Sequence, residues 1–209
     1  YNKILGENFF KKKINFTANS SLEAQIASIS DDIAYNNHDL EDGLKANLFK
    51  LNDLKNIPIL NKIISKHNKK LKKHSIDLVV RQIVRETINA MVTDVIENTK
   101  KNLQLYKIRN LQDVYKTKNQ IVSFSDNMKN FDLKIKNFLK EKMYFHESVN
   151  IKTDYGKRII KNLFFKIKKN PKKYINISKY SNLNIERMIC DYIAGMTDRY
   201  AINLYNKIK

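Results

Sequence analysis

The chain has 209 residues, a length that allows one domain with a sizeable core or one lobe of a larger domain. Hydrophobic residues make up 42% of the sequence and aromatic residues 10%, which excludes an intrinsically disordered composition. The formal net charge of +19 favours polyanionic ligands such as nucleic acid, nucleotides or an anionic membrane, although the many Lys, Asn and Ile residues are also typical of an A/T-rich genome.

Glycine and proline are scarce, with four and two residues, whereas a sheet protein of this size needs many more turn residues. The composition therefore predicts an all-α chain folded as a multi-helix bundle. The single cysteine, Cys190, excludes an internal disulfide, and its apolar neighbours predict a buried thiol. No apolar run approaches the roughly 18 residues of a membrane helix and no signal peptide opens the chain, so we expect a cytoplasmic protein without a membrane partner.

The first 19 residues are rich in Asn and Lys and are expected to form an irregular leading segment before a helical part over residues 20–209. The chain begins with Tyr1 instead of Met and continues at once into polar sequence, so we expect a fragment of a longer protein.

The first helix is predicted over about residues 21–37. Ser20-Ser21-Leu22-Glu23 has the pattern of a capping box, in which a Glu follows three residues after a hydroxyl at the N-cap. Asp39 either caps a separate helix over residues 40–50 or lies within one continuous helix.

Helical spacing continues through the rest of the chain. Pro58 suits the first turn of a helix, and Pro171 marks a break. The most regular apolar spacing runs from Ile76 to Val95 and predicts the spine of the core. No stretch shows convincing strand alternation. The predicted helices cover about residues 58–70, 75–104, 111–119, 126–144, 154–169 and 182–207.

Three side chains on the first helix have a spacing that suggests a site. Asp31, Tyr35 and Asp39 lie at i, i+4 and i+8, so they drift only about 80° around the helix and share a face roughly 12 Å long. A hard metal ion binds carboxylate oxygen, and a sugar hydroxyl needs an acceptor beside a flat ring. The opposite face is apolar. The competing interpretation is that both acids are solvated helix positions and that Tyr35 is half-buried core.

Two further segments are informative: Glu23-Ala24-Gln25 with the run from Asp31 to Leu44, and the run from Asp191 to Ala201. Both resemble the deoxyguanosine-triphosphate triphosphohydrolase family of the HD-domain superfamily. Two long matches in the same order, about 150 residues apart, are a specific signal. They imply that about residues 18–209 correspond to the C-terminal portion of an HD-domain phosphohydrolase fold.

The resemblance implies a metal-dependent enzyme that hydrolyses a dNTP at the α-phosphate and releases deoxynucleoside and triphosphate. Family members bind a divalent metal, such as Mg²⁺ or Mn²⁺, through a His, a His-Asp pair and a later Asp, and Asp31 matches that later Asp. Tyr35 and Asp39 match positions in the deoxyribose pocket, where the ring disfavours a 2′-hydroxyl and the carboxylate accepts a hydrogen bond from the 3′-hydroxyl. Arg199 and Tyr200, in the second match, are expected to contact phosphate and sugar or base. Family members are commonly homo-oligomers, and some respond to DNA or nucleotides at other sites.

The His38-Asp39 pair does not match the family's metal-binding pair, because its register places it on the substrate-pocket helix. Adjacent helical residues point about 100° apart, so both can bind one metal only with strained rotamers or a break in the helix. His67, His74 and His146 stand among lysines and are expected at the surface. The remaining metal ligands are therefore expected outside this chain, and the isolated chain is expected to be inactive. Asp32 lies where some distant relatives have a basic phosphate-binding residue, so its role is open.

Positive charge is concentrated in residues 64–74 and 157–173, and aromatic residues interleave the second stretch. Cationic surfaces with aromatic side chains suit single-stranded nucleic acid. The rival hypothesis is therefore a non-enzymatic, helical nucleic-acid-binding module, and a purely structural domain with solvated basic helix faces is a further alternative.

Overall fold

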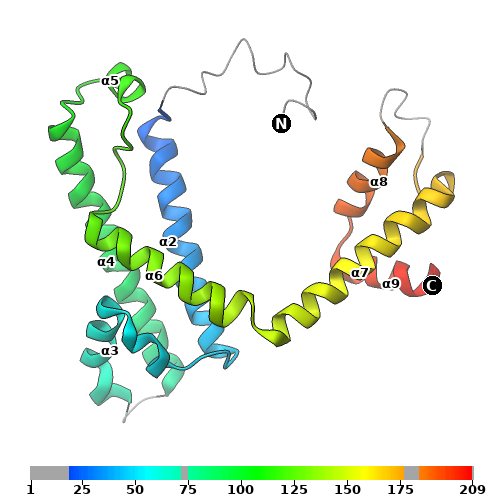
Figure 1. The fold of residues 1–209 in the computed structure, drawn as a ribbon, viewed down its shortest axis with the longest axis horizontal. Coiled ribbons are helices and arrows are strands. Elements are labelled where there is room, and N and C mark those ends of the chain that lie inside the picture. The colour runs from blue at the N-terminus through cyan, green and yellow to red at the C-terminus, as the bar shows by residue number, and fades with distance from the viewer. Residues whose placement is uncertain (1–18, 72–74, 177–183, 209) are drawn as a thin grey trace. The chain divides into compact units, whose positions relative to one another are not determined.

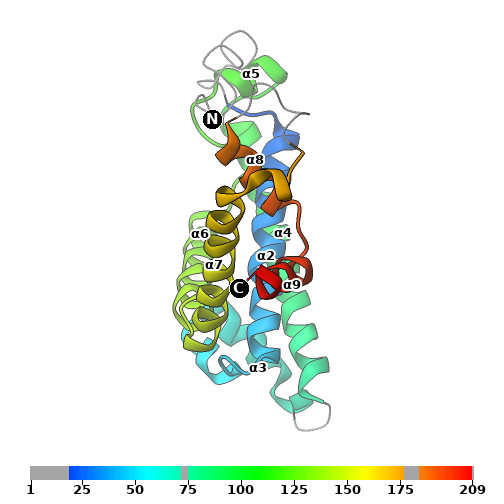
Figure 2. The same cartoon turned by 90° about the vertical axis from the view of Figure 1, so that its right-hand side faces the viewer.

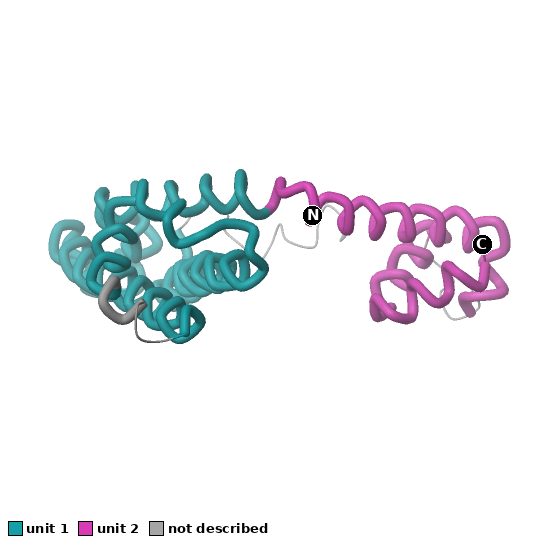
Figure 3. Tube along the Cα trace, turned by 90° about the horizontal axis from the view of Figure 1, so that it is seen from below, with its two compact units in different colours: residues 1–143 teal, residues 144–209 magenta. Residues whose placement is uncertain are grey.

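The computed structural model describes residues 19–71, 75–176 and 184–208. All regular structure in these ranges is helical and none of it is strand, which confirms the predicted all-α class. The chain divides into two compact units, residues 1–143 (unit 1) and residues 144–209 (unit 2) (Figure 3). The predicted irregular segment lies outside the described residues except for Asn19. None of the helices in the described ranges combines the length and apolar character needed to span a membrane.

Unit 1 is built on two long helices that lie side by side, α2 (Leu22–Lys45) and α4 (Ile76–Leu105) (Figures 1 and 2). Helix α3 (Pro58–Leu71) packs against α4 and against a short 3-10 helix, η1 (Leu51–Asn56). Helix α6 (Asp126–Leu139) contacts α2. The predicted boundaries of α3 and α4 agree with the structure to within about a residue.

Helix α2 is one uninterrupted helix that carries the whole first motif. Its N-cap is Ser21, whose hydroxyl oxygen accepts a hydrogen bond from the Ala24 N–H at 3.3 Å. The predicted capping box, which needs a hydroxyl three residues before Glu23, is therefore displaced by one residue from its sequence pattern. The helix continues through Asp39 to Lys45, so of the two alternatives the continuous helix is the correct one.

The core of unit 1 takes side chains from the two long helices and also from η1, α3 and α6. Ile33 and Leu40 of α2 and Ile83 and Met91 of α4 are each at most 4% exposed. Burial of each such side chain stabilises the fold by about 1.5–3 kcal/mol relative to leaving it in water. All the buried residues of α4 lie within the predicted spine from Ile76 to Val95, although Ile76 itself is exposed.

The two predicted helices after α4 are shorter than expected. Helix α5 (Leu111–Lys116) ends where the Thr117 N–H bonds to the carbonyl groups of Asp113 and Val114. Helix α6 ends at Leu139, and a single π-helical turn, η2 (Lys140–Tyr144), covers the rest of the predicted range.

Unit 2 consists of α7 (Glu147–Lys169), a 3-10 turn η3 (Pro171–Lys173), α8 (Ile185–Ala194) and α9 (Asp198–Ile208). Helix α7 begins seven residues before its predicted start at residue 154. His146 provides the cap, because its Nδ1 accepts a hydrogen bond from the Ser148 N–H at 3.3 Å.

The single helix predicted over residues 182–207 is wrong. Helix α8 ends at Ala194 with Gly195 as its C-cap, and α9 begins at Asp198. The hydroxyl of Thr197 accepts a hydrogen bond from the Tyr200 N–H at 3.3 Å, so a threonine cap starts a second helix here. Gly195 thus marks the end of a helix.

The core of unit 2 is small. Ile159, Leu163 and Ile167, spaced four residues apart on α7, pack with Ile189 of α8. The predicted burial of Cys190 is wrong, because its side chain is exposed. It follows Ile189 directly, and a step of about 100° around α8 turns it away from the face that contacts α7.

The prediction that His67 lies at the surface is also wrong, because this residue is only 3% exposed. It lies seven residues after Leu60 and three after Ile64, on the face of α3 that packs against α4, and this spacing could have revealed its burial. Its Nε2 lies 2.8 Å from Glu86 Oε1 of α4. Burial raises the pKa of Glu86, but hydrogen bonds from His67 and Gln82 more than offset this and leave that pKa lowered. His74 lies outside the described residues, and His146 is the partly exposed cap of α7.

Candidate functional site

The predicted stripe on α2 is presented on one continuous helix. Asp31 is exposed and Tyr35 is 60% exposed, whereas Asp39 is half-buried. Uninterrupted helical geometry keeps side chains at i, i+4 and i+8 on neighbouring turns of the same face. Asp31 and Tyr35 are therefore accessible to a ligand or to protein groups outside the described residues.

The opposite face of α2 is only partly apolar, which the sequence did not reveal. Besides Ile29, Ile33 and Leu40 it buries two adjacent asparagines. Asn37 donates to the Ile33 carbonyl at 2.8 Å and to Met91 Sδ at 3.3 Å. Asn36 donates to Asp132 Oδ1 of α6 at 2.9 Å, and both of these side chains are buried.

A third buried polar residue, Gln25, joins the start of α2 to the segment before α6. Its Oε1 accepts hydrogen bonds from the N–H groups of Ile121 and Val122, both at 3.0 Å, and its Nε2 donates to the Ser20 carbonyl at 2.8 Å. Asp94 of α4 binds the other end of the segment through the N–H and hydroxyl of Ser125, at 2.8 and 2.6 Å. Side chains thus satisfy backbone groups that no helix satisfies. The Glu23-Ala24-Gln25 motif was a signal for this role, but the partners of Gln25 were not visible in the sequence.

Asp32 lies in different surroundings from Asp31. Its Oδ2 is 3.2 Å from Lys136 Nζ of α6, and the same ammonium lies 2.9 Å from Asp132 Oδ2. Partial burial lowers the pKa of Lys136, but its hydrogen bonds and charge interactions with Asp132 and Asp32 prevail and raise that pKa. Asp32 therefore forms part of a polar contact between α2 and α6.

A cavity of about 630 Å³ opens between α2, the segment before α6 and α6 itself. Asp32 and Asp132 line it together with Asn119, Ser123 and Phe124, among others. Asp31, Tyr35 and Asp39 do not line this cavity. The cavity therefore meets α2 at Ser28, Ile29 and Asp32, and not at the three residues of the predicted stripe.

The residues described here do not complete a metal centre. Within them, no group of three or more His, Cys, Asp or Glu side chains is placed to hold a metal ion. Asp31 offers the carboxylate oxygen that Mg²⁺ and Mn²⁺ prefer, but such sites need several ligands. His38 and Asp39 lie on an unbroken part of α2, so the geometry that would let both bind one ion is not present. This chain's described residues fit one ligand of a divalent site and no more.

The second motif lies in unit 2, where α8 ends and α9 begins. The guanidinium Nε of Arg187 donates to both carboxylate oxygens of Asp191, at 2.9 and 3.0 Å. The hydroxyls of Tyr192 and Tyr200 lie 3.5 Å apart, and this hydrogen bond, together with partial burial, raises the pKa of Tyr192 to about 12. Arg199 is exposed and Tyr200 is 51% exposed.

The motif also lines an open depression of about 520 Å³, which includes Asp191, Thr197 and Tyr200. Arg199 does not line it. Tyr200 thus offers a ring face at a surface hollow, whereas Arg199 projects from α9 elsewhere.

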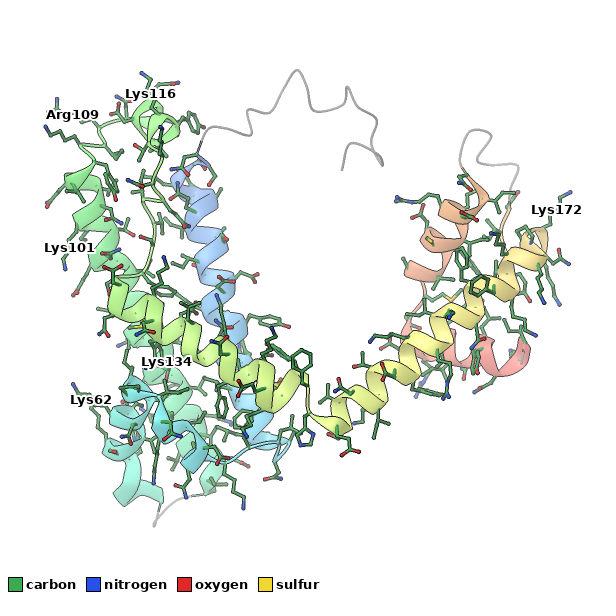
Figure 4. All side chains as sticks on the ribbon, viewed as in Figure 1. Lys62, Lys101, Arg109, Lys116, Lys134 and Lys172 are labelled. Carbon is green, nitrogen blue, oxygen red and sulfur yellow. The ribbon has the colours of Figure 1, made fainter. Side chains whose placement is uncertain are left out.

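Exposed basic residues occur in both units. In unit 1, exposed basic side chains extend outward from different elements, as Figure 4 shows for Lys62, Lys101, Arg109, Lys116 and Lys134. In unit 2 several of the basic residues of 157–173 are engaged: Lys157 pairs with Asp154 and Lys168 with Glu186, and Arg158 and Lys173 lie over the rings of Tyr155 and Tyr174. Part of the stretch 64–74 lies outside the described residues.

Comparison with known proteins relates both motifs to one group of similarly named proteins. Residues 122–207 match the family described as phosphohydrolase-associated domain. A deoxyguanosinetriphosphate triphosphohydrolase-like protein of Pelagibacter ubique is 47% identical over 203 residues, which cover 97% of this chain and 54% of the relative. Proteins of the same name from Leptospira interrogans and Caulobacter vibrioides are 37% and 34% identical over 90% of this chain, and over 51% and 49% of their own lengths.

The chain thus spans about half the length of the curated relatives it matches. These names do not support the rival hypothesis of a non-enzymatic nucleic-acid-binding module. They confirm the resemblance inferred from the two motifs: over nearly all of its length, this chain is homologous to the deoxyguanosinetriphosphate triphosphohydrolase-like proteins.

Proposed function

We propose that this chain supplies part of the active site of a triphosphohydrolase that cleaves dGTP or a similar dNTP at the α-phosphate, releasing deoxynucleoside and triphosphate. The observation that carries the proposal is the 47% identity to the Pelagibacter ubique relative across 97% of the chain. The exposed stripe on α2 supports it with residues of suitable chemistry. Because the chain spans about half of its relatives, the complete activity is proposed for the chain together with the region of the relatives that it does not match.

Asp31 is proposed as one ligand of a divalent metal, Mg²⁺ or Mn²⁺, whose other ligands come from outside this chain. Its exposed carboxylate provides hard oxygen donors, and no residue that the structure describes forms an ion pair with it. When bound, such a metal lowers the pKa of a coordinated water and offsets charge on phosphoryl oxygens. The contribution of this chain is to hold the carboxylate on a rigid helix.

Tyr35 and Asp39 are proposed to bind the deoxyribose. Tyr35 presents an exposed ring one turn along α2 from Asp31, and Asp39 lies one turn further. A ring packed against C2′ disfavours a ribose hydroxyl at that place, and a carboxylate accepts a hydrogen bond from the 3′-hydroxyl. The exposed Arg199 and Tyr200 of unit 2 are proposed as further substrate contacts, with a guanidinium for phosphate and a ring for sugar or base.

A chimera tests the proposal. In it, this chain replaces the matched region of the Pelagibacter ubique relative, and triphosphate release from dGTP is measured with Mn²⁺. We expect activity in the chimera and a loss of about a hundredfold or more on Asp31→Asn, because a metal ligand is removed. Asp154→Asn, at an exposed position of α7, is the matched control and should leave the rate unchanged. Full activity of the Asp31→Asn chimera would exclude Asp31 as a ligand.

The sugar assignment is tested in the same chimera by comparing GTP with dGTP. Tyr35→Ala should raise kcat/KM for GTP relative to dGTP by about tenfold, since the ring no longer occupies the space of the 2′-hydroxyl. Asp39→Asn should instead raise KM for dGTP. If Tyr35→Ala slowed both nucleotides equally, the ring would have no role in sugar selection.

The 209-residue chain by itself is expected to release no triphosphate from dGTP with Mn²⁺, because one carboxylate holds these ions only weakly. Robust turnover by the purified chain would show that its residues suffice for a metal site.

A further inference from the structure

Two consecutive aspartates on α2 differ sharply in their surroundings. Asp32 Oδ2 lies 3.2 Å from Lys136 Nζ, and that ammonium also lies 2.9 Å from Asp132 Oδ2. The second oxygen of Asp132 accepts the hydrogen bond from Asn36. Asp31 forms no such contact with any residue that the structure describes. One ammonium therefore bridges two carboxylates from different helices directly beside the proposed metal ligand.

Without that ammonium, Asp32 and Asp132 would be a pair of facing carboxylates. The Asp32 side chain is 56% exposed and the Asp132 side chain is buried, but both acids line the same open cavity of about 630 Å³, so an ion can approach the pair from the side of Asp32. Divalent cations bind carboxylate oxygens at about 2.0–2.6 Å, and a position between two carboxylates suits them. Lys136 Nζ, at 2.9 and 3.2 Å from the two acids, occupies the place that such an ion would take.

We propose that Lys136 is a resident cation that closes the Asp32–Asp132 pair to divalent metal, and thereby directs the metal to Asp31. Lys136 is a positioning residue in this scheme, since it touches neither substrate nor the proposed ligand. The role of Asp31 rests on the proposed function, whereas the closing of the Asp32–Asp132 pair does not. The scheme also gives Asp32, whose role the sequence left open, a defined partner.

The test counts Mn²⁺ bound to the 209-residue chain by the electron paramagnetic resonance signal of the free ion. Lys136→Met should create a site that binds Mn²⁺ about tenfold more tightly than the wild-type chain, because two carboxylates replace one as available donors. Lys136→Arg retains a cation and should behave as wild type. The proposal is overturned if Lys136→Met, with its helical circular dichroism intact, binds Mn²⁺ no better than wild type.

Double variants locate the new site. Adding Asp32→Asn or Asp132→Asn to Lys136→Met should abolish the added binding, and adding Asp31→Asn should leave it in place. Retained tight binding after both Asp32→Asn and Asp132→Asn would contradict the proposal.

Lys136→Met leaves Asp132 without its ammonium and can weaken folding, so Lys136→Gln is the second variant, whose amide still donates hydrogen bonds. Mn²⁺ should raise the melting temperature of Lys136→Gln more than that of wild type, because the ion binds the folded state of the variant more tightly. An equal response of the two proteins would refute the closing role. The proposed function is tested separately. If Asp31→Asn did not change Mn²⁺ binding by the wild-type chain, this would count against Asp31 as a ligand, whereas the role of Lys136 is decided by the Lys136 variants alone.

Discussion

The two motif-bearing segments are held in their units by different forces. In unit 1, α2 is fixed by buried polar side chains as well as apolar ones: Gln25, Asn36 and Asn37 all form cross-element or backbone hydrogen bonds. In unit 2, α8 is held against α7 mainly by apolar contact at Ile189, and the motif's Asp191 and Tyr200 are exposed. The two motifs are comparable signals in the sequence, but the helices that carry them are held in place by different kinds of contact.

The difference concerns how precisely each helix is oriented. Apolar packing tolerates some rotation of a helix, whereas a buried hydrogen bond is lost when its partner moves, at a cost of about 1–3 kcal/mol per unsatisfied group. Rotation of α2 would separate Asn36 and Gln25 from their hydrogen-bond partners. It would also turn Asp31 and Tyr35 away from the exposed face. The buried amides of α2 therefore fix the direction of its exposed stripe, and α8 has no equivalent.

The largest expected effect tests the apolar anchoring of unit 2. Ile189→Ala should lower the free energy of unfolding by about 2–5 kcal/mol, because a fully buried side chain is lost from a small core. Ile185→Ala, at a position on the same helix that is 44% exposed, is the matched control and should cost less than about 1 kcal/mol. Denaturant unfolding measures both. Equal effects would mean that α8 is not anchored through Ile189.

The polar anchoring of unit 1 is tested by Gln25→Ala. The change leaves the N–H groups of Ile121 and Val122 without their acceptor and should cost about 2–4 kcal/mol. Hydrogen exchange at these two amides should accelerate more than elsewhere in unit 1. Gln112→Ala, at an exposed position of α5, should change neither quantity. Unchanged protection of both amides in Gln25→Ala would show that the segment is held by other contacts.

Two helical glycines contrast the packing of the units. A Cβ at Gly43 of α2 would collide with the buried ring of Phe49. The ring of Phe138 packs edge-on against that ring, with 4.9 Å between the ring centroids. Gly43→Ala should therefore destabilise the chain by about 1–3 kcal/mol. A Cβ at Gly156 of α7 meets nothing within 4 Å, so Gly156→Ala should stabilise it by about 0.5–1 kcal/mol through higher helix propensity. Thermal unfolding distinguishes the two, and a stabilising Gly43→Ala would show that Phe49 can move aside.

Features that depend on residues close together in the sequence were predicted, and features that depend on distant residues were mostly missed. The predicted helix over 75–104 nearly coincides with α4, because its apolar period is local and unbroken. The break between α8 and α9 was missed because apolar spacing continues across Gly195, and only the Thr197 cap marks the new start. The shared face of Asp31, Tyr35 and Asp39 required only helical geometry.

Contacts between distant residues could not be derived in this way. Gln25 meets Ile121 across 96 residues, and Lys136 meets Asp32 across 104, so no local pattern pairs them. His67 and Cys190 were misplaced for a related reason, since burial depends on which face a neighbouring helix covers. The sequence showed which residue types lie along each face of a helix, but it did not show which partner each polar side chain contacts.

The smallest expected effect concerns the exposed motif of unit 2, at the hydrogen bond between Tyr192 and Tyr200. The folded pKa of Tyr192, about 12, is above the ordinary tyrosine value near 10, chiefly because of this bond and secondly because of burial. The associated stability is therefore fully present below pH about 10 and is lost as pH rises through the folded pKa. Tyr200→Phe should bring the pKa of Tyr192 back toward its ordinary value.

Carbon-13 labelling of tyrosine rings measures this titration by nuclear magnetic resonance, with the Tyr192 signal among the 11 tyrosines assigned by its loss in Tyr192→Phe. Near pH 11, Tyr192 should remain mostly protonated in the wild-type chain and be mostly ionised in Tyr200→Phe. If Tyr192 still titrated near 12 in Tyr200→Phe, burial and not the hydroxyl pair would set its pKa.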